Sequence, residues 1–398
     1  MEWKEVRLGD VCSRVCSGGT PKSTNLSYYG GEIPWLNTKE IDFNRIYSTE
    51  KTITESGLSN SSAKWIVPNT VTVAMYGATA GKSCIVKVPM TTNQACCNLT
   101  INEEVADYEF IYYTLKNDYT TLASLANGGA QQNLNAQIIK DYVLQMPSLA
   151  DQRRIASILS SLDRKIELNN KINADLEEMA QAIFKNWFVD FEPFKDGKFV
   201  DSELGMIPEG WKVGTLGDIT NNKSAKVKER NDVKVLSPVT SGELVLSEEY
   251  FTKQVFSSSI AKYKIVNKGD FAYNPARVNI GSLGRNEFDF YGCVSPVYVV
   301  FSVLEGYENY FDLFRKTDFF KDSVASLAIG GVRQSLSYDD LSLIETIIPS
   351  KNIVEKFNNL YNQMKKTIKA NKLENSRLSL LRDTLLPRLM SGELEVPE

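Results

Sequence analysis

The sequence predicts an α+β fold: two repeated globular units of α/β type with twisted β-sheets, joined by two long helices that pack as an antiparallel coiled coil with pseudo-twofold symmetry. Three observations predict this fold. Short β-type runs alternate with Gly, Pro and Asn turns in two stretches, each stretch precedes one long helical segment, and several motifs occur twice in the same order. The 398 residues are enough for roughly two to three domains.

The repeated motifs lie about half a chain apart. Residues 3–10 (WKEVRLGD) and 211–218 (WKVGTLGD) share Trp, Lys, Leu, Gly and Asp at an offset of 208. Residues 128–134 (GGAQQNL) match 330–336 (GGVRQSL) at an offset of 202, as do the Pro-Ser pairs that follow them. Matches in the same order indicate one ancestral unit that is present twice.

The repeat divides the chain into six expected segments. The globular units cover residues 1–148 and 211–349, the long helices cover 149–190 and 350–390, the linker covers 191–210, and the tail covers 391–398. The tail follows the second helix as the linker follows the first, and the linker leads to Trp211, the counterpart of Trp3. We therefore expect the tail to lie near Trp3.

Both helical segments carry apolar residues at alternating spacings of four and three, which is typical of a coiled-coil seam. The first helix begins near Asp151, a suitable N-cap shortly after Pro147. Its seam consists of Ile155, Leu159, Leu162, Ile166, Leu176, Ala180, Ile183 and Trp187. The second seam, shifted by 202 residues, consists of Phe357, Tyr361, Met364, Ile368, Leu378, Leu385 and Leu389, with the charged Arg382 as an interruption.

Each seam is also interrupted by two asparagines at the same place, and lone asparagines in a seam specify its register. Antiparallel packing would place Asn169 opposite Asn375 and Asn173 opposite Asn371, whereas parallel packing would pair Asn169 with Asn371. Two copies joined by a short linker favour the antiparallel form. The alternative is that these asparagines lie on solvated faces.

Composition excludes several classes of function. The chain contains no histidine, which excludes Ser-His-Asp and Cys-His nucleophiles and His-ligated metals. The six cysteines form no paired C-x-x-C motif, so we expect neither a metal site nor a cofactor on this chain. The amino-terminal residues are charged and no apolar run reaches membrane-spanning length, so we expect a cytoplasmic protein without membrane contact. A net charge of −4 argues against nonspecific coating of nucleic acid but leaves room for a local basic face.

One segment resembles a phosphate-binding loop. Residues 77–83 (GATAGKS) are one residue short of the Walker A spacing. We therefore predict a β-turn-β loop that presents Tyr76, Thr79 and Lys82. The chain also lacks a Gly-x-Gly-x-x-Gly motif and an Asp/Asn-Pro-Pro-Tyr motif, so we predict no catalytic residues.

Several loops carry side chains suited to base edges and phosphates. Arg and Lys can pair with guanine, Asn and Gln can pair with adenine, and glycines such as Gly18 and Gly19 would let backbone amides approach phosphates. In the first unit the candidates are Thr20, Lys22, Asn25, Tyr28, Asn37, Lys39, Tyr76, Thr79, Lys82, Gln131, Gln132 and Asn133. In the second unit they are Lys226, Lys228, Asn274, Arg277, Asn279, Ser282, Arg285, Arg333 and Gln334.

With these motifs in place, the chain resembles the specificity subunit of type I restriction–modification enzymes. The resemblance covers essentially the whole chain. It rests on Leu8-Gly9-Asp10, Asn93-Gln94 and residues 17–21 (SGGTP), 29–35 (YGGEIPW), 184–191 (FKNWFVDF), 203–211 (ELGMIPEGW) and 386–394 (LPRLMSGEL).

The resemblance implies that each globular unit is a target recognition domain for one half of a split double-stranded DNA site. It implies that the long helices set the spacer between the half-sites and dock two modification (methyltransferase) subunits. Restriction (translocase and nuclease) subunits would complete the complex. S-adenosylmethionine, ATP and Mg²⁺ would be bound by those partner subunits.

Two other functions remain open at this point. The chain could be a coiled-coil scaffold that binds proteins and no DNA. It could also be an enzyme that acts on nucleotides with carboxylates or with the loop at residues 77–83.

Overall fold

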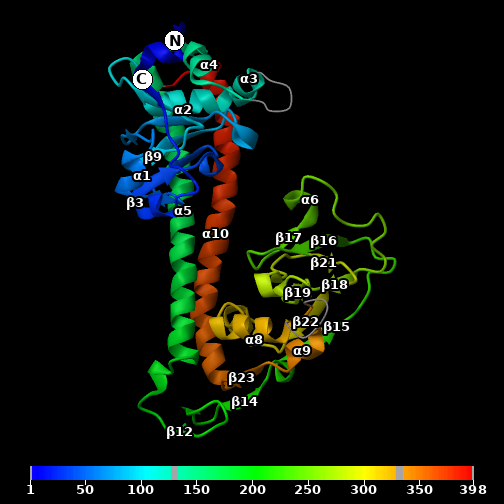
Figure 1. Ribbon diagram of the computed structural model, residues 1–398. Helices are drawn as coiled ribbons and strands as arrows, with labels where there is room; N and C mark the ends of the chain where they lie inside the picture. The colour runs from blue at the N-terminus through cyan, green and yellow to red at the C-terminus, as the bar shows by residue number, and fades with distance from the viewer. Residues whose placement is uncertain (1, 127–132, 329–334, 397–398) are drawn as a thin grey trace. The chain divides into compact units, whose positions relative to one another are not determined.

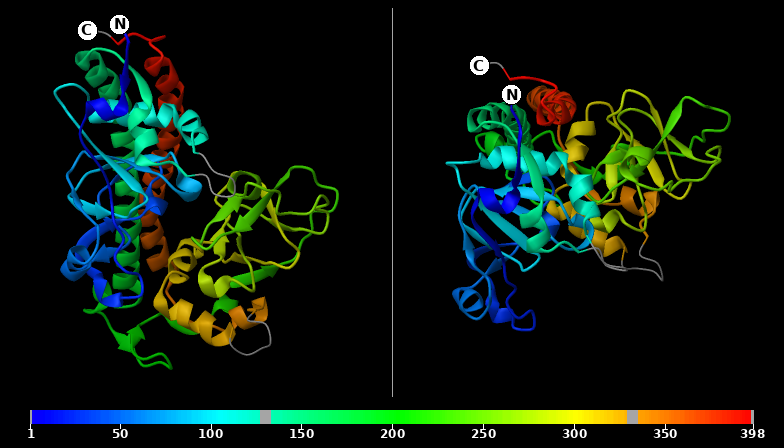
Figure 2. Two further views of the ribbon diagram at one scale, coloured as in Figure 1. Left: turned by 45° about the horizontal axis from the view of Figure 1, so that its top comes forward. Right: turned by 90° about the horizontal axis from the view of Figure 1, so that it is seen from above.

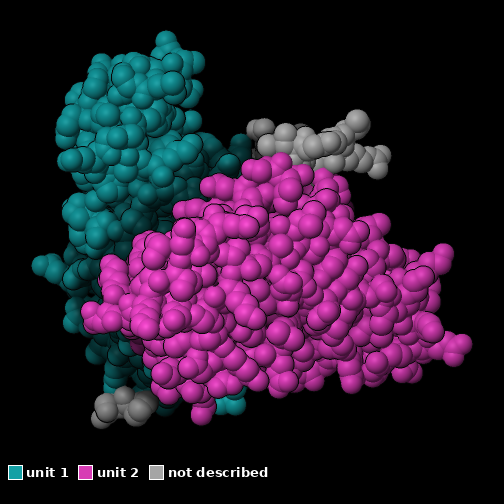
Figure 3. All heavy atoms as spheres, turned by 90° about the horizontal axis from the view of Figure 1, so that it is seen from below, with its two compact units in different colours: residues 1–170, 372–398 teal, residues 171–371 magenta. Residues whose placement is uncertain are grey.

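The computed structural model describes residues 2–126, 133–328 and 335–396. Two compact units make up the chain, shown in two colours in Figure 3. Unit 1 combines residues 1–170 with 372–398, and unit 2 consists of residues 171–371. Both long helices, α5 (Leu149–Phe188) and α10 (Lys351–Met390), contribute one segment to each unit.

Unit 1 contains two sheets and a strand pair. The larger sheet has the order β2 (Cys12–Ser17), β10 (Cys96–Ile101), β7 (Val71–Ala74), β8 (Ser83–Val86) and β4 (Asn44–Ile46). The smaller sheet has the order β5 (Thr52–Ile53), β3 (Tyr29–Leu36), β9 (Met90–Thr92) and β6 (Trp65–Ile66). Strand β1 (Lys4–Arg7) pairs with β11 (Val143–Met146), and the short helices are α1 (Glu55–Ser59), α2 (Tyr108–Asn117), α3 (Tyr119–Ser124) and α4 (Ala136–Asp141).

Unit 2 repeats this plan. Its first sheet has the order β15 (Thr220–Lys223), β22 (Val299–Val303), β19 (Phe271–Tyr273) and β20 (Leu283–Arg285). Its second sheet has the order β17 (Leu244–Leu246), β16 (Val233–Pro238), β21 (Tyr291–Val294) and β18 (Lys264–Val266). Strand β14 (Lys212–Thr215) pairs with β23 (Glu345–Ile348), and the helices are α6 (Ser247–Tyr250), α7 (Glu308–Phe314), α8 (Asp318–Ala328) and α9 (Tyr338–Ser342). The linker carries the hairpin of β12 (Phe199–Val200) and β13 (Ile207–Pro208).

The two units share one topology, which confirms the predicted fold (Figure 1). In the second sheet described for each unit, the central strands are parallel, β3 with β9 and β16 with β21, and the outer strands are antiparallel to them. In each unit the first strand pairs antiparallel with the strand that leads into a long helix. Among the described residues, unit 1 alone has the additional strand β4, which runs parallel to β8.

Each globular domain packs on both long helices, because the seams present apolar side chains to its core. In unit 1 the core around Phe110 includes Ile155 and Leu159 of α5 and Leu386 and Leu389 of α10. In unit 2 the core around Phe311, Phe271 and Phe301 is joined by the apolar residues Ala180, Phe184, Phe188, Val354 and Phe357. Both long helices therefore belong to the cores of the units.

The helices are antiparallel, and the asparagines pair as predicted. In unit 1, Asn169 Nδ2 donates to Asn375 Oδ1 at 2.9 Å and to Glu374 Oε2 at 2.7 Å. In unit 2, Asn371 Nδ2 donates to Asn173 Oδ1 at 2.9 Å. Asn169 and Asn173 are buried, so the alternative of solvated asparagines is wrong for these two residues.

The Asn169–Asn375 pair gives a first prediction. Replacing both residues with leucine is expected to leave the free energy of unfolding unchanged or to raise it by about 1 kcal/mol, because removing both partners of a buried hydrogen bond is often neutral or stabilising. Asn169 Oδ1 is also buried without a hydrogen-bond partner in the described structure. Urea denaturation measures the effect, with Asn169→Leu alone as the control, since that variant leaves Asn375 Oδ1 without its donor and should be less stable. A double variant less stable than the single one would contradict this expectation.

The tail lies near Trp3, as expected. A Cβ atom added to Gly392 would lie 2.7 Å from Trp3 Nε1, and Gly392 has a φ of +74°. Figure 2 shows the amino-terminal segment close to the end of α10 in unit 1. Leu394 and Val396 pack against the core of this unit, so both ends of the described chain stabilise one domain.

Candidate nucleic-acid interface

The loop between β7 and β8 is the centre of the candidate interface in unit 1. It contains a short 3-10 turn, η4 (Gly77–Thr79), and Ser83 is buried as the first residue of β8. The prediction of a β-turn-β loop is confirmed. Tyr76 is 41% exposed and forms an antiparallel bridge with Asn133, and Thr79 is half-buried.

Unit 2 places an equivalent loop between β19 and β20. It contains the 3-10 turn η7 (Val278–Ile280). The amide of Leu336 donates to Pro275 O at 3.1 Å, as the amide of Leu134 donates to Met75 O at 2.8 Å in unit 1. Each unit therefore brings the loop together with a leucine from later in the same domain, Leu134 or Leu336. The candidates Gln131, Gln132, Arg333 and Gln334 lie outside the described residues.

Lys82 is engaged inside unit 1. Its Nζ lies 2.6 Å from Asp42 Oδ1, and its side chain is 26% exposed. This ion pair ties the loop to the segment between η3 (Thr38–Glu40) and β4. A phosphate would have to compete with Asp42 for Lys82, because the lysine charge is already paired.

The other candidates of unit 1 lie on short polar turns. Asn25 caps η2 (Leu26–Tyr28), with its side chain accepting from Ser27 N, and Asn37 forms a capping box with Glu40. Thr20 and Tyr28 are half-buried, and Lys22 and Lys39 are exposed. Neither lysine forms an ion pair within the described part of the chain.

Gly18 and Gly19 are needed for packing within the unit. Their amides donate to Cys96 O and Thr92 O at 3.3 and 2.9 Å. A Cβ atom at Gly18 would lie 2.2 Å from Thr92 O, and one at Gly19 would lie 2.1 Å from Ala63 N. The expectation that these amides approach phosphates is wrong, since the sheet already uses them.

In unit 2 the loop side chains divide into an accessible and an inaccessible group. Arg277 and Asn279 are exposed, Asn274 is half-buried, and Lys226 and Lys228 are exposed on the segment before β16. Ser282 is buried, and its hydroxyl donates to Pro238 O at 2.9 Å, so the prediction of an accessible contact is wrong for this residue. The Arg285 side chain is only 16% exposed, and its Nη1 donates to Asn309 Oδ1 at 2.9 Å.

A buried charge cluster in unit 1 was not predicted from the sequence. Arg45, on β4, is 3% exposed at its side chain and reaches Glu109 Oε1 at 3.1 Å and Glu167 Oε1 at 3.0 Å. It also lies 3.9 Å from Asp163 Oδ2. Asp163 accepts from Tyr113 Oη at 2.6 Å, and its second oxygen lies 2.6 Å from Arg382 Nη1. The charged interruption of the second seam, Arg382, therefore has an acidic partner on α5.

The surroundings of Arg45 and Tyr113 shift the pKa values of both groups upward. Burial would lower the pKa of Arg45, but Tyr113 and Glu167 raise it above its ordinary value. Burial and the neighbouring Asp163 raise the pKa of Tyr113, so its hydroxyl keeps its proton and donates it. Arg45 follows Asp42 and Asn44 in a polar stretch, so no local pattern in the sequence marked it as a buried charge.

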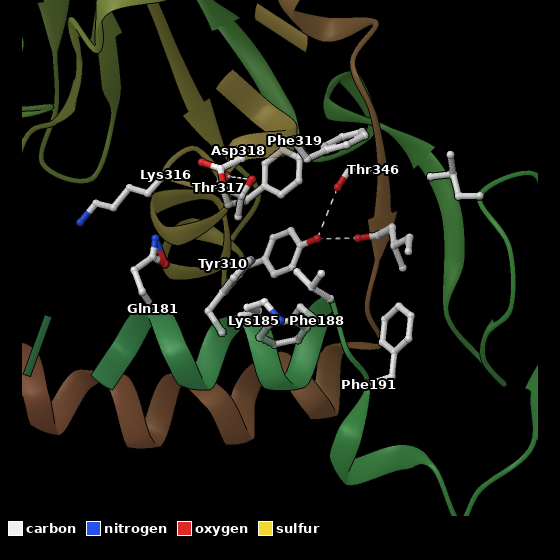
Figure 4. Close-up of a pocket in the computed structure, with 15 residues that line it drawn as sticks. Gln181, Lys185, Phe188, Phe191, Tyr310, Lys316, Thr317, Asp318, Phe319 and Thr346 are labelled. Carbon is white, nitrogen blue, oxygen red and sulfur yellow. Dashed lines mark hydrogen bonds between the residues drawn. The ribbon is translucent and has the colours of Figure 1, made fainter. Parts of the chain in front are cut away.

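A cavity of about 640 Å³ lies in unit 2 at the carboxyl end of α5. Figure 4 shows Phe188, Phe191 and Phe319 around it, and the Tyr310 hydroxyl bonds to Ile347 O at 2.6 Å and to Thr346 Oγ1 at 3.3 Å. The lining is mainly aromatic and aliphatic and contains no His or Cys. No cluster of three or more metal-ligating side chains occurs among residues 2–126, 133–328 and 335–396. No helix within those same ranges has both the length and the apolar character needed to cross a membrane.

Two units of one topology, each presenting the same loop on a shared pair of helices, define a duplicated recognition protein. Residues 1–178 match the family model described as type I restriction modification DNA specificity domain. The chain is 29% identical, over its whole length and 94% of the relative, to the type I restriction enzyme MjaIX specificity subunit of Methanocaldococcus jannaschii. It is 23% identical, over 99% of the chain and 100% of the relative, to the HindI specificity subunit of Haemophilus influenzae.

A crystal structure of the type I restriction–modification S subunit from M. genitalium shares the fold. It has a TM-score of 0.62 at 17% identity and covers 100% of this chain and 97% of that one. Over its whole length the chain is therefore similar to type I restriction–modification specificity subunits, and residues 1–178 match the DNA specificity domain of that family.

Proposed function

We propose that the chain reads a bipartite double-stranded DNA site, one half with residues 1–148 and the other with residues 211–349. The observation that carries the proposal is the duplicated loop pair: the β7–β8 and β19–β20 loops each lie beside a leucine from later in the same domain, Leu134 or Leu336. Once one half-site is bound, the second contact becomes intramolecular and gains effective concentration.

The proposed reading surface follows from exposure and chemistry. Arg277, Asn279 and Tyr76 are exposed and carry groups that can contact base edges. Lys22, Lys39, Lys226 and Lys228 are exposed cations suited to phosphates. The surface further includes Thr20, Asn25, Tyr28, Asn37, Thr79, Asn133 and Asn274, with Gln131, Gln132, Arg333 and Gln334 from the segments outside the described residues.

We propose that the long helices set the spacer and dock two modification subunits. Leu373 and Leu380 on α10 are 54% and 70% exposed. Leu373 lies two residues after the seam position Asn371, and Leu380 lies two residues after the seam position Leu378. Since two residues turn about 200° around a helix, both leucines point away from α5. Apolar side chains exposed on one helix face are typical of a partner contact.

The remaining assignments depend on that complex. Restriction subunits would join it, and S-adenosylmethionine, ATP and Mg²⁺ would be held by the modification and restriction subunits. Such a complex would meet its DNA in the cytoplasm.

Arg277→Ala tests the reading role. Because the variant removes the side chain proposed to pair with a guanine, it should weaken binding to the cognate site by about 1–3 kcal/mol and relax the preference at one base pair. The measurements are the methylated motif in DNA from cells that express the chain with its modification partner, and binding titrations of the purified complex.

Lys226→Ala is the matched control. Removal of a phosphate-binding side chain should weaken binding to all sequences alike and reduce the salt slope, with the motif unchanged. An unchanged motif and unchanged affinity for Arg277→Ala and for substitutions of the other exposed loop residues would favour the scaffold function instead.

A further inference from the structure

The contacts between globular domain and helix in unit 1 have a defined charge polarity. The cation is on the globular side, where Arg45 of β4 reaches Glu167 at 3.0 Å and Asp163 at 3.9 Å, both on α5. A second cation, Lys87, follows β8, and its Nζ donates to Asn69 Oδ1 at 2.7 Å. Burial lowers the pKa of Lys87, and Glu109 and Glu167 act against that shift. The acids Asp163 and Glu167 on the helix are thus met by one cation of the domain, Arg45, while Lys87 bonds to Asn69 within the domain.

Unit 2 has the opposite polarity. The acids that reach α10 are on the globular side, on the segment that follows β20, where Glu287 and Asp289 also pair with Arg285 and Lys268 of the same domain. Lys365 Nζ lies 2.6 Å from Glu287 Oε1, and Lys369 Nζ lies 3.4 Å from Asp289 Oδ2.

On the helix side, these contacts occupy equivalent places in the repeat. Asp163 and Glu167 correspond to Lys365 and Lys369 at the offset of 202 that also relates the paired asparagines. The globular domains are aligned through their paired strands. Val71 of β7 pairs with Ile85 of β8, as Phe271 of β19 pairs with Arg285 of β20. Two residues further along, Lys87 in unit 1 therefore corresponds to Glu287 in unit 2. The charge is therefore reversed at these equivalent positions, although the cation that contacts α5 in unit 1 is Arg45 on β4, a strand without a counterpart among the described residues of unit 2.

One neighbouring contact does not share this reversal. Arg164 on α5 lies 3.6 Å from Glu109, and its counterpart on α10 is Lys366, which is also a cation. Because the sign is the same on both helices, this position cannot distinguish them.

We propose that the reversed polarity assigns each globular domain to its own helix segment, so that the two copies do not exchange places. On the α10 segment, the first domain would bring Arg45 against Lys365 and Lys369 with no acid from the helix. On the α5 segment, the second domain would bring Glu287 and Asp289 against Asp163 and Glu167. Like charges at a docking surface reject the wrong partner, and Arg45, which is 3% exposed, would be a buried charge without its acids, which is strongly unfavourable. This fixes which domain lies at which end of the frame.

The first arm of the test uses the native order of the chain. Lys365→Glu with Lys369→Glu should speed hydrogen–deuterium exchange in residues 283–294 several-fold. The matched control is Lys356→Glu with Lys366→Glu, the same charge change at exposed lysines of α10 that form no ion pair in the described structure. Equal exchange in the two variants would overturn the proposal.

The second arm exchanges residues 3–148 with 211–349 in the full chain. The apolar contacts of the two domains with the helices also differ, so the exchanged chain should melt below the parent for more than one reason. Adding Glu167→Lys, Lys365→Glu and Lys369→Glu isolates the charge contribution, with Asp163 kept because it also pairs with Arg382.

The compensated chain should recover several degrees of melting temperature. No recovery relative to the uncompensated exchange, or an exchanged chain as stable as the parent, would contradict the assignment. If neither exchanged chain folds, the native-order variants decide. None of these readouts involves DNA, so failure here is separate from failure of the proposed reading function.

Discussion

Replacing Arg45 with methionine is expected to lower the free energy of unfolding by about 3–5 kcal/mol, because removing one partner of a buried ion cluster leaves the other charges uncompensated. The Arg45 side chain is 3% exposed and contacts Glu109 and Glu167. Methionine keeps much of the side-chain volume, so the effect reports the charge and its hydrogen bonds. Guanidinium denaturation followed by circular dichroism measures it.

Two companion variants sharpen this result. Arg45→Lys keeps the charge but replaces the planar guanidinium, which has several donors, with one ammonium. It should therefore recover only part of the lost free energy of unfolding. Lys39→Met, at an exposed lysine of the same domain, should change stability by less than about 0.5 kcal/mol. If Arg45→Met costs no more than Lys39→Met, the cluster does not hold the domain to its helix.

Removing one paired heptad from both long helices should change the recognised spacer. Deletion of residues 171–177 and 367–373 keeps the Asn169–Asn375 pair and the spacing of the seams on either side. Seven residues of helix are about 10.5 Å long, or about 3 base pairs of DNA. The half-site sequences should be retained, and the parental site should no longer be modified.

The new site should also be bound less tightly. Three base pairs rotate one half-site by about 100° around the duplex, whereas a heptad leaves the helix face almost unchanged. The DNA must therefore twist or bend to meet both domains. Motif analysis of methylated DNA measures the spacer, and insertion of one heptad in each helix is the control, which should lengthen it by the same amount. An unaltered spacer in both variants would contradict the role of the helices as a ruler.

The sequence was most informative where a pattern recurs. The seam and its asparagines predicted the antiparallel register, because a buried amide in an apolar seam has few partners that satisfy it. The pairing of Asn173 with Asn371 followed from position alone. The repeated motifs likewise predicted that both globular domains have one topology.

Other features depend on contacts between distant residues that no local pattern records. Gly18 and Gly19 look like a phosphate-approaching turn, yet neighbouring backbone leaves no room for a Cβ atom. Ser282 looks like an exposed loop residue, but its hydroxyl bonds to Pro238, 44 positions away. Arg45 meets Glu167 over a separation of 122 residues, which only the folded chain reveals.

Unit 1 is assembled from both ends of the chain, whereas unit 2 is one continuous stretch. During synthesis the second domain has all of its core residues before the first one does. The amino-terminal domain waits for Leu386, Leu389 and Val396 to complete its core. Since these residues are made after the whole core of the second domain, the domain that is translated first is the second to complete its core, and a chain that terminates before Leu386 leaves apolar surface of the amino-terminal domain exposed.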